Sequence, residues 1–365
     1  MFNILHLIPS LEGGGAERQL AILAGEQSRR GWQVNVGIRR GGVHENALRG
    51  SGAAVHWLGD HRGMNPLLLG KISRLIKKTK PDVVQTWMPQ MDIIGGIAAL
   101  RHALPWVVSE RNSQHDYEQL RFDTWGRQRV AKHASAVVAN SSGGAAYWRN
   151  ISSGSTPVFQ IANAVDVAAI RRVAGAGRAH VRRRHGRPEI LVVGRLAPQK
   201  ATEVIIPAIS KLAAYLDVHV SIIGEGPLRQ TLEKSISEAG LSERIALLPY
   251  QADWWKLLPE ASALVSMSRY EGHPNVVLET MAAGCPLIVS DIPAHREFLD
   301  EKSALFVPPN RPAALAAALL ALLTDPDAAG QRAKRAAACV DRLTIESAAD
   351  AYAAVYNTVI ARGQQ

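Results

Sequence analysis

The chain has 365 residues, a length typical of about two domains. Hydrophobic residues make up 47% of it and charged residues 20%, a composition typical of globular domains that excludes an intrinsically disordered chain. The formal net charge of +10 leaves nucleic acid, an anionic membrane surface and phosphorylated substrates as candidate partners.

Short apolar runs alternate with helical patterns from the first residues onward. The first run has no basic segment before it and no cleavage site after it, so we expect a strand rather than a signal peptide. The expected strands are 4–8, 33–38, 54–58, 83–86, 106–109, 136–139, 190–193, 218–223, 245–248, 264–267 and 287–290. Helical patterns lie between most of them, for example at 16–29, 65–78 and 201–215. This alternation predicts βαβ units with mostly parallel sheets.

Three consecutive glycines, Gly13, Gly14 and Gly15, follow the first strand and open a helix. Glycine lets the backbone approach a ligand closely, and a helix N-terminus attracts negative charge. Any tight turn between a strand and a helix would use the same residues. The triplet is neither a dinucleotide fingerprint nor a phosphate loop with a lysine.

The segment 71–80 is a basic amphipathic helix candidate. Ile72, Leu75 and Ile76 follow helical spacing, and four lysines and one arginine occupy other positions. Such a helix can lie on an anionic membrane face. An ordinary surface helix packed on a sheet has the same pattern, so the choice depends on the function inferred below.

A basic stretch rich in glycine and alanine divides two series of strands and helices. It runs over 167–187, and a charge run of this kind is more typical of a solvated linker than of a binding patch. We therefore expect two Rossmann-like halves, 1–166 and 188–345, that face each other. Ligands of doubly wound sheets bind past the carboxyl ends of the strands, so the loops after the strands should carry the chemistry.

Arg195 and Lys200 follow the first strand of the second half, five positions apart. Two fixed cations at a strand end can neutralise a diphosphate. If a sugar–phosphate bond breaks there, they stabilise the charge that grows on the leaving group. The alternative is a pair of surface cations with no ligand.

Two glutamates, Glu271 and Glu279, flank the start of a short predicted helix. Pro274 and Asn275 are start signals, with asparagine suited to the N-cap, and Gly284 ends the helix. The helix N-terminus favours a phosphate, and a carboxylate one turn in can accept hydrogen bonds from a sugar diol. The arrangement suits a ligand with a central diphosphate and a ribose at one side. Alternatively, both glutamates are solvated charges.

No metal site is expected. Asp325 and Asp327 have the D-x-D spacing of some metal-dependent sugar transferases, but they lie between two predicted helices and are interpreted as a turn. Cys285 and Cys339 have no metal or disulfide spacing, which fits a reducing cytosol. The apolar run 312–323 is too short to span about 30 Å of hydrocarbon.

Together these segments resemble the retaining glycosyltransferases of family 4, which have the GT-B fold. The residues that carry the resemblance are 13–20 (GGGAERQL), 163–166 (NAVD), 194–200 (GRLAPQK), 224–228 (GEGPL) and 268–286. They span most of the chain in a fitting order, and the last block is the most specific. The resemblance implies an α/β protein with two Rossmann-like doubly wound domains that face a central cleft, and a final helix at about 346–365 that returns to the first domain.

The resemblance also implies roles for individual residues. Arg195 and Lys200 hold the diphosphate of a nucleotide-sugar donor, Glu279 holds the ribose, and Glu271 faces the transferred sugar, so that Arg195, Lys200 and Glu271 are the catalytic candidates. Further donor contacts are expected from Asn275, Val276 and Val277, from Gly224, Gly226 and Tyr250 near the base, and from Gly14 and Gly15, which close over the donor. No metal or other cofactor is implied.

The chain departs from the family pattern at two places. Ala201 follows the lysine where many relatives have glycine, and we expect that loop to tolerate the methyl group. Many relatives also have a histidine after the strand that here ends at residue 109. This chain has Arg111 and Asn112 there and His115 further on, and these three are candidates for binding the acceptor.

The loops at 87–89 and 110–113 resemble those of bacterial enzymes that build surface polysaccharides or lipid-linked oligosaccharides. We therefore predict retaining transfer of a hexose or N-acetylhexosamine from a UDP-sugar, or next a GDP-sugar, to such an acceptor. The enzyme would be cytoplasmic, peripheral to the inner face of the plasma membrane, and would not bind nucleic acid. The alternatives are a nucleotide-sugar 2-epimerase, a nicotinamide-dependent oxidoreductase, or a non-catalytic binder of nucleotide sugars or RNA.

Overall fold

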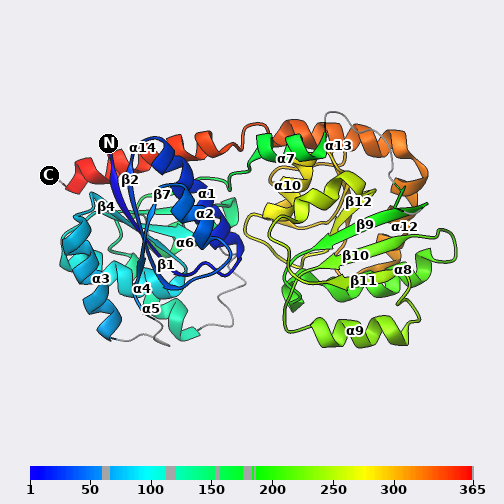
Figure 1. Cartoon of the computed structure of the whole chain (residues 1–365), viewed down its shortest axis with the longest axis horizontal. Helices are drawn as coiled ribbons and strands as arrows, with labels where there is room; N and C mark the ends of the chain where they lie inside the picture. The colour runs from blue at the N-terminus through cyan, green and yellow to red at the C-terminus, as the bar shows by residue number, and fades with distance from the viewer. Residues whose placement is uncertain are drawn as a thin grey trace. The chain divides into compact units, whose positions relative to one another are not determined.

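The computed structural model describes residues 1–59, 66–111, 121–152, 154, 156–175, 183–184 and 186–363. The chain divides into two compact units (Figure 1). The first combines Met1–Ala164 with Ile345–Gln365, and the second is Val165–Thr344. Each unit has its own sheet and cores.

The first unit is built on a parallel sheet with strand order β3-β2-β1-β4-β5-β6-β7. Its strands are β1 (Asn3–Ser10), β2 (Gln33–Arg40), β3 (Ala54–Trp57), β4 (Val83–Trp87), β5 (Trp106–Glu110), β6 (Ala136–Ala139) and β7 (Val158–Gln160). Its helices are α1 (Gly15–Arg29), α2 (Glu45–Gly50), α3 (Pro66–Thr79), α4 (Pro89–Arg101), α5 (Arg121–Ala131), α6 (Ser142–Ser152) and α14 (Ile345–Gly363).

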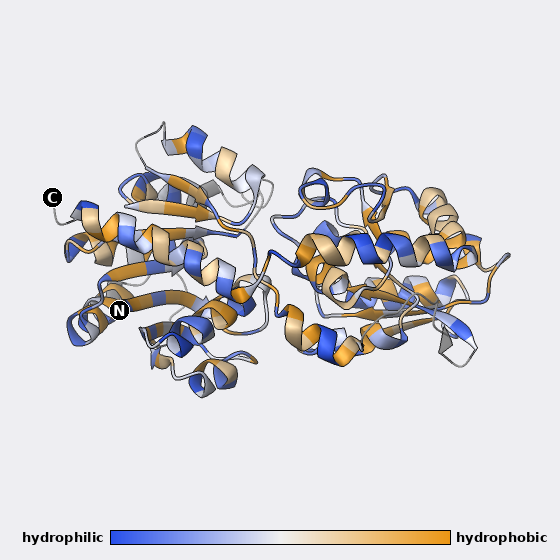
Figure 2. Ribbon diagram, turned by 90° about the horizontal axis from the view of Figure 1, so that it is seen from above, coloured by the Kyte–Doolittle hydropathy of each residue, from blue (hydrophilic) through white to orange (hydrophobic). Residues whose placement is uncertain are grey.

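Helices cover both faces of this sheet, as expected where the strands are continuous apolar runs. Figure 2 shows these strands largely in the hydrophobic colour. Leu20 of α1 and Val355 of α14 pack with Ile4 on one face. Ile72 of α3 and Ile94 of α4 pack on the other. The last helix of the chain is therefore part of the first unit's core.

The second unit has a sheet of order β11-β10-β9-β12-β13-β14, in which a short β8 pairs with β9 in antiparallel orientation. Its strands are β8 (Arg183–Arg184), β9 (Arg187–Val193), β10 (His219–Ile223), β11 (Ile245–Leu248), β12 (Ala263–Ser266), β13 (Leu287–Ser290) and β14 (Leu305–Val307). Its helices are α7 (Val167–Ala174), η2 (Pro198–Lys200), η3 (Thr202–Val204), α8 (Ile205–Leu212), α9 (Arg229–Glu238), η4 (Trp254–Glu260), α10 (Asn275–Ala283), α11 (Pro293–Arg296), α12 (Pro312–Thr324) and α13 (Pro326–Val340).

Two apolar cores again cover the two faces of the sheet. Ile209 of α8 and Leu319 of α12 belong to one core. Val277 of α10, Ile170 of α7 and Val340 of α13 belong to the other. The strand order reverses between β9 and β12, which makes their carboxyl ends the switch point where doubly wound folds bind ligands.

All the expected strands are present, and β7, β8 and β14 were not predicted because each has only two or three residues. The predicted helix at 201–215 begins later than expected. Ala201 adopts a left-handed conformation between two 3-10 turns, so α8 starts only at Ile205.

The predicted linker at 167–187 is wrong for its first part. Residues 167–174 form α7 of the second unit, where Asp166 caps the helix by accepting a hydrogen bond of 2.9 Å from the Ala169 amide. Ile170 is buried against the core, which explains why this segment is ordered as a helix. The arginines of this segment predicted a solvated linker, but Arg171 forms an ion pair with Asp341 at 2.6 Å.

A buried charge cluster lies at the carboxyl ends of β4 and β5. Arg127 of α5 contacts Asp92 at 2.6 Å and Glu110 at 2.8 Å, and all three side chains are at most 2% exposed. Trp148 donates a hydrogen bond of 2.6 Å to Glu110. Burial, only partly opposed by Arg127, raises the pKa of Asp92 to about 6. One guanidinium thus holds two carboxylates inside the first unit.

Within the described residues, no single helix is long and apolar enough to cross a membrane. Helices α12 and α13 meet the length and hydropathy criterion only as a pair, and they are bent by 100° relative to each other.

Candidate active site

The loop after β9 carries both predicted cations. Arg195 is exposed and donates a hydrogen bond of 3.4 Å to Gln199, whereas Lys200 ends the 3-10 turn η2 and is partly buried. Ala201 has φ 44° and ψ 34°, a conformation that costs a non-glycine residue about 1–2 kcal/mol. Its methyl group is fully buried in the core, which offsets part of that cost and explains how alanine replaces glycine here.

Lys200 forms an ion pair with Glu271, on the loop after β12. The Glu271 side chain is 8% exposed and also accepts a hydrogen bond of 2.5 Å from the Ser268 hydroxyl. Burial alone would raise the pKa of Glu271, but the Lys200 ammonium and the two hydrogen bonds outweigh it and hold that pKa below its ordinary value. The two predicted catalytic residues therefore meet at the switch point.

Helix α10 begins one residue earlier than an N-cap at Asn275 would place it. Pro274 occupies the N-cap position and Asn275 is the first helical residue, so the predicted asparagine cap is wrong. The proline already fixes the entry of the chain, and its carbonyl accepts the amide of Val277 at 3.1 Å. Gly284 ends the helix with φ 65°, as predicted. The side chain of Val277 is fully buried, which leaves its backbone as the part that could face a ligand.

Glu279 lies one turn into α10 and is 3% exposed. Its carboxylate accepts a hydrogen bond of 2.8 Å from the indole of Trp254. Together with the burial of Glu271, this excludes the alternative that both glutamates are solvated surface charges. The contact with a ribose stays a prediction.

Gly224 and Gly226 support the loop that carries Arg195. A Cβ atom at Gly224 would lie 2.0 Å from the carbonyl oxygen of Gly194, and one at Gly226 would lie 2.3 Å from that of Leu196. Leu196 in turn donates its amide to the Glu225 carbonyl at 2.8 Å. Both glycines are therefore required by close backbone packing, whether or not they also border a base. Tyr250, the other residue predicted there, is 41% exposed.

We expect Gly226→Ala to lower the free energy of unfolding by at least about 3 kcal/mol, because overpacking adds to backbone strain at φ 158°. The matched control is Gly240→Ala. Gly240 has φ 66° but no atom within 4 Å of a new Cβ, so strain alone should cost about 1–2 kcal/mol. Urea unfolding of both variants measures the difference. Equal losses of stability would contradict the overpacking, because they would show that the Leu196 carbonyl can move away from the new methyl group at no cost.

Gly14 and Gly15 lie in the first unit, where Gly14 caps α1 and Gly15 begins it. A Cβ on Gly14 would lie 2.2 Å from a carboxylate oxygen of Glu17. Glu17 is buried, and that burial raises its pKa. Glycine at position 14 therefore makes room for a side chain of its own helix. Closure of this loop over a donor stays a prediction.

Arg111 is held by its own unit. Its guanidinium lies 4.7 Å from the ring centre of Trp87, donates a hydrogen bond of 2.9 Å to Asn163 and another to the Tyr352 hydroxyl. Arg111 thus ties the end of β5 to α14, which is a structural role that the sequence did not predict. The other two acceptor candidates, Asn112 and His115, lie outside the described residues.

Three buried polar residues next to Glu271 were not predicted from the sequence: Ser268, Ser290 and His295. All three are at most 1% exposed. Ser268 follows β12, Ser290 ends β13, and His295 lies on α11 just after β13. A polar residue at or just past the carboxyl end of a buried strand is the signal that could have found them. As for metals, no group of three or more His, Cys, Asp or Glu residues in the described part of the chain could hold an ion. Asp325 instead caps α13, accepting the Ala328 amide at 3.0 Å.

Two family descriptions match the chain in succession. Residues 13–169 match Glycosyltransferase Family 4, and residues 177–338 match Glycosyl transferases group 1. Together they cover most of both units.

Curated relatives are glycosyltransferases. An alpha-D-kanosaminyltransferase of Streptomyces kanamyceticus is 31% identical over 192 residues, and this match spans half of each chain. The lipopolysaccharide core biosynthesis glycosyltransferase LpsE of Rhizobium meliloti is 23% identical over 277 residues, 75% of each chain.

Solved structures share the fold. HepE of Anabaena in complex with UDP-glucose has a TM-score of 0.85 at 19% identity, over 98% of this chain and 100% of that one. The lipopolysaccharide outer core galactosyltransferase WaaB in its apo form has a TM-score of 0.72 at 16% identity, over 99% of each chain. The two parallel sheets are thus those of a GT-B fold with two Rossmann-like domains.

Proposed function

The chain belongs to the family 4, group 1 glycosyltransferases, and on that premise we propose that it transfers a hexose or N-acetylhexosamine from a UDP-sugar to a glycan acceptor, with retention of configuration. The observation that carries the proposal is the Lys200–Glu271 ion pair at the carboxyl ends of β9 and β12. Arg195 lies on the same loop as Lys200, and α10 begins four residues after Glu271.

The charges suit a donor with a central diphosphate. Arg195 and Lys200 supply two cations, and the N-terminus of α10 adds the positive end of a helix dipole. As the bond between sugar and diphosphate breaks, negative charge grows on the leaving group and these three features stabilise it. Glu271 is ionised and buried, so it can accept hydrogen bonds from sugar hydroxyls and orient the ring. This scheme needs no metal ion or other cofactor.

Thermal unfolding with added nucleotides tests the donor site. We expect UDP and UDP-sugars to stabilise the protein, by about 2.7 kcal/mol at 100 times the dissociation constant. GDP, ADP, dTDP and CDP with their sugars are the comparison set. The Arg195→Ala variant should lose most of the stabilisation, because it lacks one of the two cations proposed to bind the diphosphate. It should still fold, because the Arg195 side chain is exposed. A folded protein that responds to none of these nucleotides would contradict the proposal.

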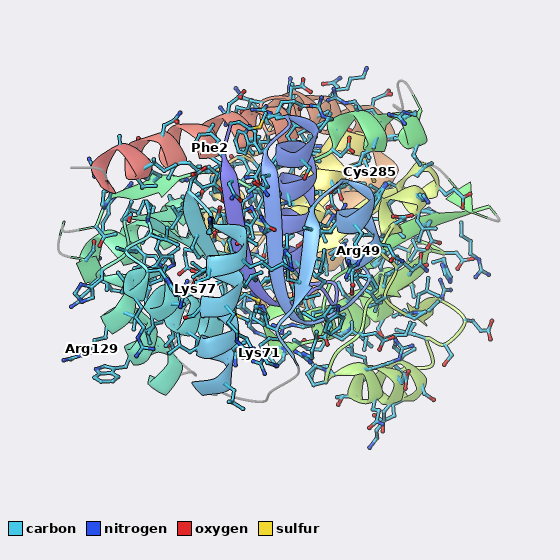
Figure 3. The ribbon with its side chains drawn as sticks, turned by 60° about the vertical axis from the view of Figure 1, so that its left-hand side comes forward. Phe2, Arg49, Lys71, Lys77, Arg129 and Cys285 are labelled. Atoms are coloured by element: carbon cyan, nitrogen blue, oxygen red, sulfur yellow. The ribbon has the colours of Figure 1, made fainter. Side chains whose placement is uncertain are left out.

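We further propose that the acceptor is lipid-linked and that α3 docks on the inner face of the plasma membrane. Arg74, Lys77 and Lys78 are exposed on this helix, and Leu67 at its start is 63% exposed. Figure 3 shows Lys71 and Lys77 at the surface of the first unit. Basic residues beside an exposed apolar side chain suit an anionic lipid surface.

Changing Arg74, Lys77 and Lys78 together to serine is expected to weaken binding to vesicles containing anionic lipid about 100-fold, from about 1 kcal/mol per lost charge. The matched control changes three exposed lysines of the second unit: Lys211, Lys234 and Lys256. Vesicle co-sedimentation at low and high salt measures both variants. Equal binding by both, or no binding by the unmodified protein, would contradict the docking of α3.

A further inference from the structure

A chain of three hydrogen bonds leads from Glu271 to a buried histidine. The Ser268 hydroxyl donates to Glu271 at 2.5 Å, and the Ser290 hydroxyl donates to the Ser268 carbonyl at 2.6 Å. Nδ1 of His295 lies 2.7 Å from the Ser290 carbonyl oxygen. A carbonyl can only accept, so Nδ1 carries a proton and donates it. The nitrogen of His295 that can gain a proton is therefore Nε2.

Nε2 of His295 is buried, and among the described residues it has no hydrogen-bond partner. His295 lies on the short helix α11, which follows β13, and its side chain is fully buried. A buried basic nitrogen without a donor opposite it is an unusual feature that calls for an explanation. It can bind a proton without breaking an existing contact.

Three charged groups act on this imidazole. Burial lowers the pKa of His295, and the Lys200 ammonium lowers it further. The hydrogen bond to Ser290 and the negative charges of Glu271 and Asp291 raise that pKa. The net pKa is below the ordinary histidine value, so His295 is neutral at neutral pH. Asp291 is paired with Arg296 at 2.7 Å, so Glu271 and Lys200 are the groups whose balance a ligand could change.

The proposed function requires Lys200 to bind the donor diphosphate, and this inference rests on that function. When the ammonium turns to the diphosphate, the buried Glu271 carboxylate loses its counter-ion. An unpaired buried charge is costly, and the diphosphate brings further negative charge close by. Both changes favour a positive charge on His295.

We propose that donor binding draws one proton from solvent onto Nε2 of His295, and that the resulting imidazolium replaces Lys200 as the counter-charge of Glu271. No bond of the donor breaks in this step, and Lys200 stays an ammonium. Donor affinity then depends on pH. Above the pKa of the free protein's His295, the dissociation constant rises with pH by up to tenfold per unit, until the pKa of the complex is passed.

Isothermal titration calorimetry with UDP-glucose near pH 7 tests the proposal. Each phosphate of this probe carries one ester bond and one anhydride bond, and its single remaining acidic group is ionised near pH 7, so the probe itself releases or binds no proton. Titrations in phosphate, HEPES and Tris buffers give the number of protons taken up, because these buffers differ in ionisation enthalpy. We expect uptake approaching one proton for the unmodified protein.

The decisive variant is His295→Asn, because an asparagine amide can still donate to the Ser290 carbonyl but cannot titrate. We expect it to bind UDP-glucose with no proton uptake and with a flat pH profile. The control is His133→Asn, an exposed histidine of the first unit, which should keep the full uptake.

Three outcomes would overturn the proposal. Binding without proton uptake by the unmodified protein excludes it, as does equal uptake by His295→Asn. Failure of both UDP-glucose and UDP-N-acetylglucosamine to bind at all overturns the proposed donor and this inference with it, so the two failures are distinguishable. If His295→Asn does not fold, the affinity of the unmodified protein from pH 6 to 8 decides, because a flat profile there excludes proton uptake.

Discussion

Replacing Arg127 with methionine is expected to lower the free energy of unfolding by about 3–5 kcal/mol. The guanidinium contacts both Asp92 and Glu110, and the apolar side chain would leave two carboxylates buried without a cation. Urea unfolding followed by tryptophan fluorescence measures the loss, since Trp148 donates to Glu110 and reports on this cluster.

The matched control is Arg129→Met on the same helix. Arg129 stacks on the exposed Trp125 at 5.4 Å, so its loss should cost less than about 1 kcal/mol. The Arg127→Met deficit should also shrink as pH falls. The pKa of Asp92 in the folded protein is about 6, above its ordinary value, so the ionised Asp92 carboxylate destabilises the fold. Below that pH the carboxyl group is protonated, and the cost of burying its charge disappears. A loss below 1 kcal/mol, or one that grows in acid, would contradict this account.

Arg195→Ala and Lys200→Ala are each expected to lower kcat/KM by at least about 100-fold, the scale of removing one group that stabilises a leaving group. Arg195 is exposed, so its removal should leave the unfolding midpoint unchanged. Lys200→Ala should also destabilise the protein, because Glu271 then stays buried without its counter-ion. The effect on activity is thus separable from the effect on folding.

Lys234→Ala provides the control for both variants, because Lys234 is an exposed cation on α9 of the same unit. It should keep full activity. Steady-state release of UDP in the presence of acceptor measures all three proteins. Full activity in both Arg195→Ala and Lys200→Ala would remove the two cations from the mechanism.

The architecture was predictable because its signal is local. Strands such as β4 and β12 are continuous apolar runs, and the runs alternate with helical periods, so two parallel sheets follow from the pattern alone. The approach of the Lys200 loop to the Glu271 loop was predictable for a related reason. Loops at the carboxyl ends of β9 and β12 must meet when these strands are neighbours.

The contacts that assign charged side chains were not predictable, because they join residues far apart in sequence. Arg111 was expected to meet an acceptor, yet it donates to Tyr352, 241 positions away. Glu110 was not expected to join a buried cluster with Arg127. The arginines of α7 predicted a solvated linker, but Ile170 of this helix packs in a core of the second unit. Charge patterns show where ions are, but tertiary packing decides which of them are paired.

Transfer of a sugar to an acceptor would show whether the protein is a retaining glycosyltransferase. The purified protein would be incubated with the UDP-sugar that stabilises it and a polyprenyl-diphosphate-linked glycan, and the products would be resolved by mass spectrometry and NMR. We expect UDP to be released in proportion to acceptor and the new glycosidic bond to keep the anomeric configuration of the donor. An epimerised nucleotide sugar without acceptor, an inverted bond, or no product from any donor that binds would contradict it.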